Sequence, residues 1–167
     1  MSRGQIAGQI FIYIMAAIVI GGIALIGYSA IQSIFAKTCD AGKVTFKADM
    51  DSMIEKYTAY GSVNKKLFAA PCDYETICFV DKNAIGNNHP STPFSCDNQI
   101  IQDSVTSTDK IEQNIFVISG KKTTGLGYSD LITLAVPEKC TCITQRNNNF
   151  YITFKGKGSS VEISETT

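Results

Sequence analysis

The chain has 167 residues, of which 44% are hydrophobic and 18% are charged, and its 15 basic and 15 acidic residues give a formal net charge of zero. This balance argues against a nucleic-acid-binding protein, which would carry a basic surface, and the apolar content argues against a wholly disordered chain. The charges are unevenly distributed, because all 15 acidic residues and 14 of the basic residues lie in residues 37–167.

The first predicted element is a long apolar helix over residues 5–36. These 32 residues include no Asp, Glu, Lys, Arg or His, and 23 of them are hydrophobic. As a helix, the segment would be about 48 Å long, whereas the hydrocarbon core of a bilayer measures about 30 Å. Its apolar run also exceeds that of a secretory signal peptide. We therefore predict a membrane-inserted helix, which argues against a cytosolic enzyme.

Small residues within this helix would allow another helix to approach closely. Ala17 and Gly21 are four residues apart, and Gly22 and Gly27 follow. Glycine is also common in membrane helices generally. A monomeric membrane anchor and a helix that packs against copies of itself therefore both remain open.

The remaining 131 residues, 37–167, are enough for one domain with a modest core. All six cysteines lie in it, and an even number of cysteines in a small domain is typical of disulfides in an oxidising compartment. We therefore predict an extracellular domain and a cytoplasmic N-terminus, with buried thiols as the alternative. The disulfide candidates are Cys39, Cys72, Cys78, Cys96, Cys140 and Cys142.

Six cysteines allow 15 full pairings, and the sequence does not choose among them. Cys72 and Cys78 flank a turn-rich connection and could close a small loop. Cys140 and Cys142 would point to the same face of a strand, so each is expected to pair with a cysteine elsewhere. Cys96 would hold a long surface loop.

An amphipathic helix is predicted from about Thr45 to Tyr60. Its apolar residues recur at helical spacing, which predicts one face packed against a sheet. Gly61 is a reasonable helix stop, and the segment 40–42 suggests a kink or short connection after the apolar helix. The residues of the stripe are Phe46, Met50, Met53, Ile54 and Tyr57.

Short strand-like segments follow, and 146–149 separates two of them as a plausible hairpin turn. The stretches 81–110 and 120–129 are interpreted as loops. Together these elements predict an α+β domain in which an antiparallel sheet of five to seven strands packs on the amphipathic helix. The predicted strands are 66–70, 76–80, 114–119, 131–136, 140–145, 150–155 and 160–164.

No constellation of residues predicts catalysis. The cysteine spacings C-x5-C and C-x-C do not match the paired C-x2-C ligands of structural zinc sites. The single histidine, His89, precedes a proline in the most loop-like stretch. Nucleophile elbows and phosphate-binding glycine loops are missing from the sequence. We therefore predict no catalytic residue, no metal ligand and no cofactor, and we do not expect an enzyme.

At the N-terminus, Arg3-Gly4 is followed by Gln5-Ile6-Ala7-Gly8-Gln9 and then by the apolar helix. This arrangement resembles the class III signal peptide of archaeal type IV pilins and archaellins. In that family a membrane peptidase cuts after a basic-Gly pair, and the apolar helix stays in the mature chain. The resemblance implies a leader of residues 1–4, with cleavage between Gly4 and Gln5. Gln9 departs from the family, because the Glu common at this position is thought to neutralise a neighbouring subunit's new amino terminus.

The resemblance implies a structural subunit of an archaeal type IV pilus-like surface filament that mediates adhesion. The implied partners are copies of the same chain through their N-terminal helices, the membrane, a prepilin peptidase-like enzyme and an assembly machinery. A different class of function also remains open: a single-pass, membrane-anchored extracellular binding domain that does not polymerise. Gln9, which carries no charge, favours this alternative.

Overall fold

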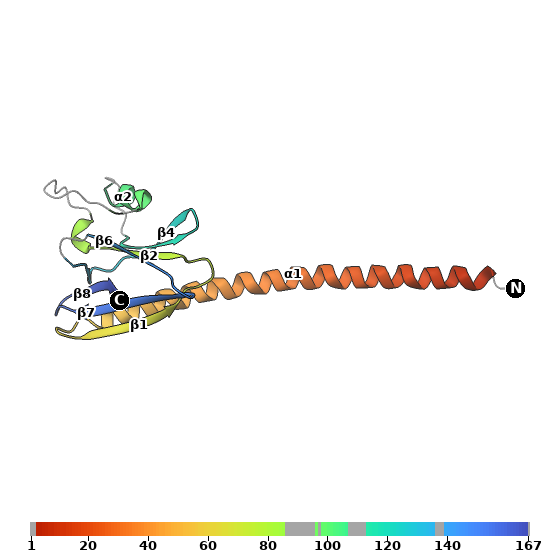
Figure 1. The fold of residues 1–167 in the computed structure, drawn as a ribbon, viewed down its shortest axis with the longest axis horizontal. Helices are drawn as coiled ribbons and strands as arrows, with labels where there is room; N and C mark the ends of the chain where they lie inside the picture. The colour runs from red at the N-terminus through yellow and green to blue at the C-terminus, as the bar shows by residue number, and fades with distance from the viewer. Residues whose placement is uncertain (1–2, 86–95, 97, 107–112, 136–138, 167) are drawn as a thin grey trace. The chain divides into compact units, whose positions relative to one another are not determined.

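A computed structural model describes residues 3–85, 96, 98–106, 113–135 and 139–166 of the chain. The chain divides into two compact units, residues 1–41 and residues 42–167. We call the second unit the head domain. Figure 1 follows the chain from the red N-terminus through the helices and strands to the blue C-terminus.

A single helix, α1 (Arg3–Lys56), contains both of the helices predicted from the sequence. It runs through Asp40, Ala41 and Gly42, where we expected a kink or a connection. One glycine inside a helix costs only about 1 kcal/mol relative to alanine, and Asp40 and Ala41 are compatible with helical backbone. The local sequence therefore weakens the helix at this point without ending it.

The helix ends at Lys56, before the predicted end at Tyr60. Gly61, with a φ of 80°, lies in the turn that follows rather than at the helix cap. The Ser62 hydroxyl is 3.1 Å from the carbonyl oxygen of Tyr57 and 2.7 Å from that of Ala59, so it can donate to a backbone carbonyl in the turn that follows the helix. The chain then enters the first strand.

One four-stranded sheet consists of β1 (Val63–Ala69), β7 (Asn149–Gly156), β8 (Val161–Glu165) and β5 (Ile132–Thr133), in the order β1-β7-β8-β5. Its strands pair antiparallel except β5 and β8, which are parallel. A tight turn closed by the bridge between Arg146 and Asn149 is present at 146–149. The predicted hairpin is nevertheless wrong, because the strands that the turn joins, β6 (Cys140–Thr144) and β7, belong to different sheets. Asn147 and Asn148 adopt positive φ there, as the turns that best fit hairpin twist require.

The second sheet consists of β4 (Lys122–Gly127), β3 (Ile115–Ser119), β2 (Thr76–Val80) and β6 (Cys140–Thr144), in the order β4-β3-β2-β6. All its neighbours are antiparallel. The stretch 120–129, expected as a loop, contains β4. Gly120, with a φ of 58°, lies in the turn of the β3–β4 hairpin. The glycine-rich composition therefore reflects this turn correctly, but it led us to predict a loop where β4 is present.

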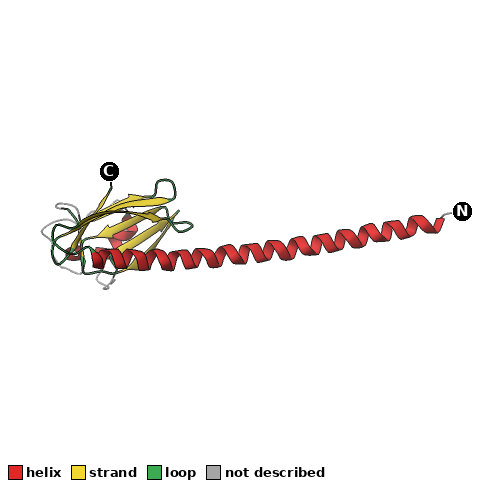
Figure 2. Cartoon of the chain, turned by 90° about the horizontal axis from the view of Figure 1, so that it is seen from below, coloured by secondary structure: helices red, strands yellow, loops and turns green. Residues whose placement is uncertain are grey.

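The predicted α+β fold class is confirmed: a long N-terminal apolar helix precedes a domain in which a helix packs on largely antiparallel sheets. All seven predicted strands are present, with ends shifted by up to three residues. The described strands form two sheets instead of the predicted one. The main core lies between the two sheets and the C-terminal part of α1, which Figure 2 shows beside the strands. Its largest fully buried side chains include Met50, Ile54, Phe79, Phe150 and Phe154.

The predicted helical stripe provides one wall of this core. Phe46, Met50 and Ile54 are buried, and Met53 and Tyr57 pack against the same cluster at its edge. The Phe46 ring lies 5.8 Å from the Phe68 ring on β1, measured between centroids. The prediction that this face of the helix packs on a sheet is therefore confirmed.

A second, smaller core forms on the other face of the β2 sheet. Along β2, Ile77 and Phe79 face the main core, whereas Cys78 and Val80 face the smaller one, as strand alternation requires. Helix α2 (Gln99–Thr106) covers this face with Ile101. Helix α2 and the short helix η1 (Lys82–Ala84) both fall in the stretch expected to be a loop.

Asn98 forms the N-cap at the start of α2, although the polar composition of the surrounding stretch had suggested a loop. The Asn98 side-chain oxygen accepts hydrogen bonds from the backbone N–H groups of Ile100 and Ile101, at 3.0 and 3.2 Å. The fully buried Asn114 plays a comparable role between strands: its side-chain amide exchanges two hydrogen bonds with the backbone of Ser129, at 2.7 and 2.8 Å. This clamp holds the segment that leads from β4 to β5.

Candidate membrane helix and cysteine cluster

The first candidate site is the apolar part of α1, whose large side chains are exposed. Leu25 and Ile26, for example, are 75% and 73% exposed. The most apolar 18-residue stretch of the helix has a mean hydropathy of 2.3, and none of it is buried within the chain. By length and composition, α1 is therefore able to cross a membrane.

Two polar side chains of α1, in and next to this segment, have hydrogen-bond partners within the same helix. The Gln32 amide donates to the Tyr28 hydroxyl at 2.8 Å, one helical turn away. The Thr38 hydroxyl donates to the Ile34 carbonyl at 2.9 Å. Internal pairing of this kind suits a lipid environment, where water is not present to satisfy polar groups.

The predicted packing residues Ala17, Gly21, Gly22 and Gly27 all lie on α1. Around each of the three glycines, an added Cβ would meet no atom within 4 Å. Their surfaces are therefore open to a neighbouring helix or to lipid, and the structure brings none of these residues together with another described segment.

Gly4, Gln5 and Gln9, the residues of the predicted processing and subunit contacts, lie in the first turns of α1. Their side chains are outside the described part of the structure. His89 likewise falls outside the described residues.

The second candidate site is the set of cysteines, all six of which are disulfide-bonded. One bond joins Cys78 to Cys142, and another joins Cys96 to Cys140. The small loop considered between Cys72 and Cys78 is therefore wrong: β2 and β6 are neighbours, and their pairing places Cys78 directly opposite Cys142. Cys39 and Cys72 are also in disulfide linkage.

The expectation from the C-x-C spacing is confirmed. Cys140 and Cys142 lie two residues apart on β6, share one face, and each bonds a cysteine from elsewhere. Cys96 is buried and fastens the segment before α2 to β6, as expected for the cysteine of the long loop.

The sequence analysis missed that these two disulfides are adjacent. The sulfur atoms of Cys96, Cys140 and Cys142 all lie within 4.8 Å of one another, and Cys78 is bonded to the last of them. The only sequence signal was the C-x-C pair, since the other two cysteines come from distant segments. Apolar side chains surround the four cysteines, namely Val80, Ile101, Val105 and Phe116.

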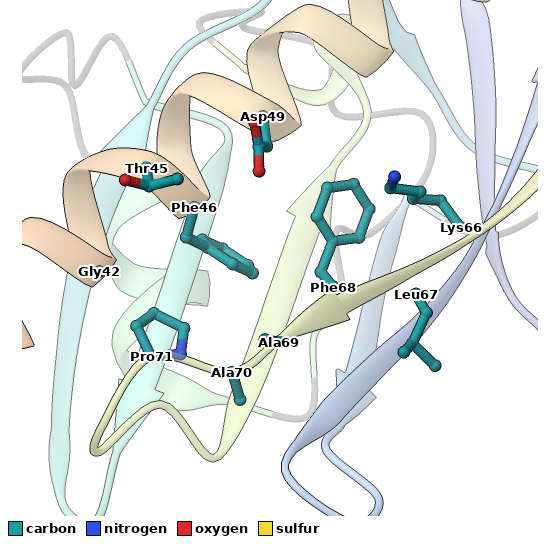
Figure 3. Close-up of a pocket in the computed structure, with 10 residues that line it drawn as sticks. All are labelled: Gly42, Thr45, Phe46, Asp49, Lys66, Leu67, Phe68, Ala69, Ala70 and Pro71. Atoms are coloured by element: carbon teal, nitrogen blue, oxygen red, sulfur yellow. The ribbon is translucent and has the colours of Figure 1, made fainter.

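A groove of about 380 Å³ also lies between α1 and β1. Figure 3 shows Phe46 and Phe68 between the two elements, with Asp49 on the helix and Lys66 on the strand. The polar side chains of the groove are Thr45, Asp49 and Lys66, and its lining includes neither a histidine nor a cysteine.

Beside this groove, Lys43 contacts two groups in the segment after β1. Its ammonium nitrogen lies 3.0 Å from Asp73 Oδ1 and 5.4 Å from the centre of the Tyr74 ring. The hydrogen bond from Lys43 lowers the pKa of Asp73. Burial raises the pKa of Tyr74, and the charge of Lys43 opposes that rise.

Comparison with known proteins adds no assignment, because no protein-family model, no curated protein and no solved structure matches the chain. The described structure itself supports two statements. A long apolar N-terminal helix is able to anchor the chain in a membrane, and a disulfide-bonded head domain fits an extracellular location.

Proposed function

We propose that the chain is a structural subunit of a type IV pilus-like surface filament, assembled through its N-terminal helix and used in attachment to surfaces. The observation that carries the proposal is the exposed apolar surface of α1, on a helix that continues without interruption into the core of the head domain. Such a helix has two stable environments, lipid or a bundle of its own copies. Either one removes the apolar surface from water.

Two further observations support the proposal. Gly21, Gly22 and Gly27 leave open backbone on the helix surface, which would let neighbouring helices approach closely. The disulfides of the head domain suit a protein that works outside the cell. In this view the precursor waits in the membrane with its head outside, a peptidase removes residues 1–4, and an assembly machinery transfers the helix into the filament.

The deciding experiment is the intact mass of the native protein, combined with N-terminal sequencing. The proposal expects a chain that begins at Gln5, and a Gly4→Val variant that keeps its first four residues. A Gly22→Val variant, altered far beyond the cut, should be processed normally and serves as the control. A native chain that begins at Met1 would contradict the proposal.

A second function keeps the same membrane helix without polymerisation: a single-pass extracellular binding domain. The uncharged Gln9 favours it, because this residue supplies no carboxylate for a neighbouring amino terminus. Electron microscopy of cell surfaces separates the two functions. Fibres with a core of parallel helices support the filament, whereas monomeric membrane particles support the anchored binding domain.

A further inference from the structure

We infer that Cys78, Cys96, Cys140 and Cys142 form a Zn²⁺-binding site in the head domain when their two disulfides are reduced. The inference starts from the positions of the sulfur atoms. Three of them lie within 4.8 Å of one another, and the fourth, that of Cys78, is bonded to that of Cys142. Four sulfurs from three separate segments of the chain therefore meet at one place.

The backbone, rather than the disulfides, holds three of these four cysteines. Cys78 lies on β2, Cys140 and Cys142 lie on β6, and the two strands are paired over their whole length. Cys142 is opposite Cys78, and Cys140 is two residues further along the same face. Reduction of the sulfur–sulfur bonds leaves this strand pairing in place, so the three thiols remain neighbours.

Cys96 is held by the packing of the segment that follows it. Ile101 and Val105 of α2 are buried against Val80 and Phe116 of the sheet. The Cα atoms of Cys96 and Cys140 are 5.4 Å apart. This apolar contact keeps Cys96 within reach of the other three thiols after reduction.

The donor set and the spacing suit zinc. Four thiolates are a common ligand set for structural Zn²⁺, at Zn–S distances of about 2.3 Å, which place the sulfurs about 3.8 Å apart in a tetrahedron. The sulfurs of Cys96, Cys140 and Cys142 already lie within 4.8 Å of each other, so small side-chain rotations are sufficient. Apolar side chains pack against the cluster, and Cys78 and Cys96 are buried, whereas Cys140 and Cys142 are partly exposed.

The sequence pattern did not indicate this site, because zinc motifs are usually recognised by two C-x2-C pairs. Here strand pairing replaces one such pair: Cys78 and Cys142 are separated by 64 residues and are adjacent in the sheet. The pairing of β2 with β6, rather than a short sequence motif, therefore brings the ligands of the site together.

The chemistry requires a reductant. Each disulfide accepts two electrons and two protons from a thiol or phosphine reductant, which is oxidised, and two thiols form. Zn²⁺ then displaces the four thiol protons, which pass to the solvent, and four Zn–S bonds form. Because protons are released, zinc should bind more tightly as pH rises.

The test uses the full chain in detergent micelles, reduced with a phosphine that is then removed without air. Co²⁺ is the probe, since tetrahedral cobalt thiolates absorb visible light, and Zn²⁺ should displace it. We expect one Co²⁺ per chain and a spectrum of four thiolate ligands. A Cys140→Ser variant should bind on the order of 100-fold more weakly or worse. The Cys39→Ser/Cys72→Ser variant is the matched control and should bind as the unaltered chain does.

If the reduced head domain unfolds, circular dichroism shows this as a loss of the β signal. If Co²⁺ or Zn²⁺ then restores the β signal, the inference is supported, because binding drives folding of a metal site. Failure to bind metal, failure to refold with it, or equal binding by Cys140→Ser would each overturn the inference. None of these results bears on the filament proposal, which is tested by the mass of the native N-terminus.

Discussion

The ion pair between Lys43 and Asp73 gives the head domain a defined response to acid. The hydrogen bond from Lys43 lowers the pKa of Asp73 below its ordinary value of 3.8, and slight burial opposes the effect. A carboxyl group with a lowered pKa in the folded state stabilises that state fully above its ordinary pKa. This contribution is lost as the pH falls through the lowered value. The effect is small, because the Asp73 side chain is 57% exposed and solvent screens the pair.

An Asp73→Asn variant should therefore lose part of the acid dependence of stability. We expect its unfolding free energy to fall less steeply below about pH 4 than that of the unaltered chain, because the variant has no carboxylate to protonate. Urea unfolding at a series of pH values measures this slope. Asp130→Asn, which removes an exposed acid before β5, is the control. Equal slopes for Asp73→Asn and the unaltered chain would contradict the role of the pair.

Gly156 is required because another part of the backbone approaches it closely. A Cβ at this position would overlap the carbonyl oxygen of Ala59 and the hydroxyl of Ser62. The backbone of Gly156 is also bonded to the same turn, accepting from Gly61 at 3.1 Å and donating to Ser62 at 2.8 Å. The end of β7 and the turn after α1 therefore fit together only without a side chain.

Gly156→Ala should destabilise the head domain by about 1–3 kcal/mol, as overpacking of a close contact does. Chemical unfolding followed by circular dichroism gives the value. Gly42→Ala is a matched control: the added Cβ would meet Pro71 at an ordinary 3.5 Å, and alanine favours helix. The contact would be refuted if both alanine variants were as stable as the unaltered chain.

The short helix α2 carries two adjacent isoleucines in opposite environments. Ile101 is fully buried against the second face of the β2 sheet, whereas Ile100 is 50% exposed. Ile101→Ala should cost about 2–5 kcal/mol, because it removes buried methylene groups and leaves a cavity. Ile100→Ala should cost far less. Hydrogen exchange of the α2 amides, together with global unfolding, measures both variants, and similar losses would show that α2 does not pack as described.

Among the helices and strands, those whose apolar residues recur at a regular spacing could be predicted from the sequence. Apolar residues recur with a period of about 3.6 in the helical stripe of Phe46, Met50 and Ile54, and they alternate with polar residues in strands, so both kinds of element could be predicted. Helix α2 was missed because eight residues give too few turns for a pattern, although its Asn98 cap was available. The β4 strand was missed because Gly and Thr suggested a loop. The separation into two sheets depends on pairing between distant segments, which periodicity does not encode.

The same limit applies to the candidate sites. The apolar helix could be recognised from composition alone, since its signal is local and covers 32 residues. The pairing of the cysteines could not, because it depends on β2 and β6 becoming neighbours across 64 residues. The sequence did show that Cys140 and Cys142 share one face of a strand. The prediction that each bonds a cysteine elsewhere in the chain was correct.

For the molecule as a whole, the apolar surface of α1 should decide where the chain resides. Two arginines, Ile18→Arg and Leu25→Arg, would each cost about 2.5–3.5 kcal/mol at the centre of a membrane helix. Both positions are exposed on the helix, at 62% and 75%, so the head domain should fold unchanged. We expect the double variant to leave the carbonate-washed membrane fraction, in which Ile18→Leu/Leu25→Ile should remain. Full retention of the arginine variant would contradict membrane insertion by this segment.

The bond between Cys78 and Cys142 also makes about half of the head domain one closed covalent ring. Helix α2 and the strands β3, β4 and β5 all lie between these two cysteines, whose sequence separation is 64. A peptidase that cuts the backbone once anywhere inside the ring opens it, yet every fragment stays attached. In the oxidised form, a nicked subunit therefore remains one covalent molecule that has gained one water, whereas the same cut in a fully reduced chain would give two separate polypeptides. If the head domain works outside the cell, as proposed, the disulfide would keep the chain covalently intact after a single cut, independently of the stability of the fold.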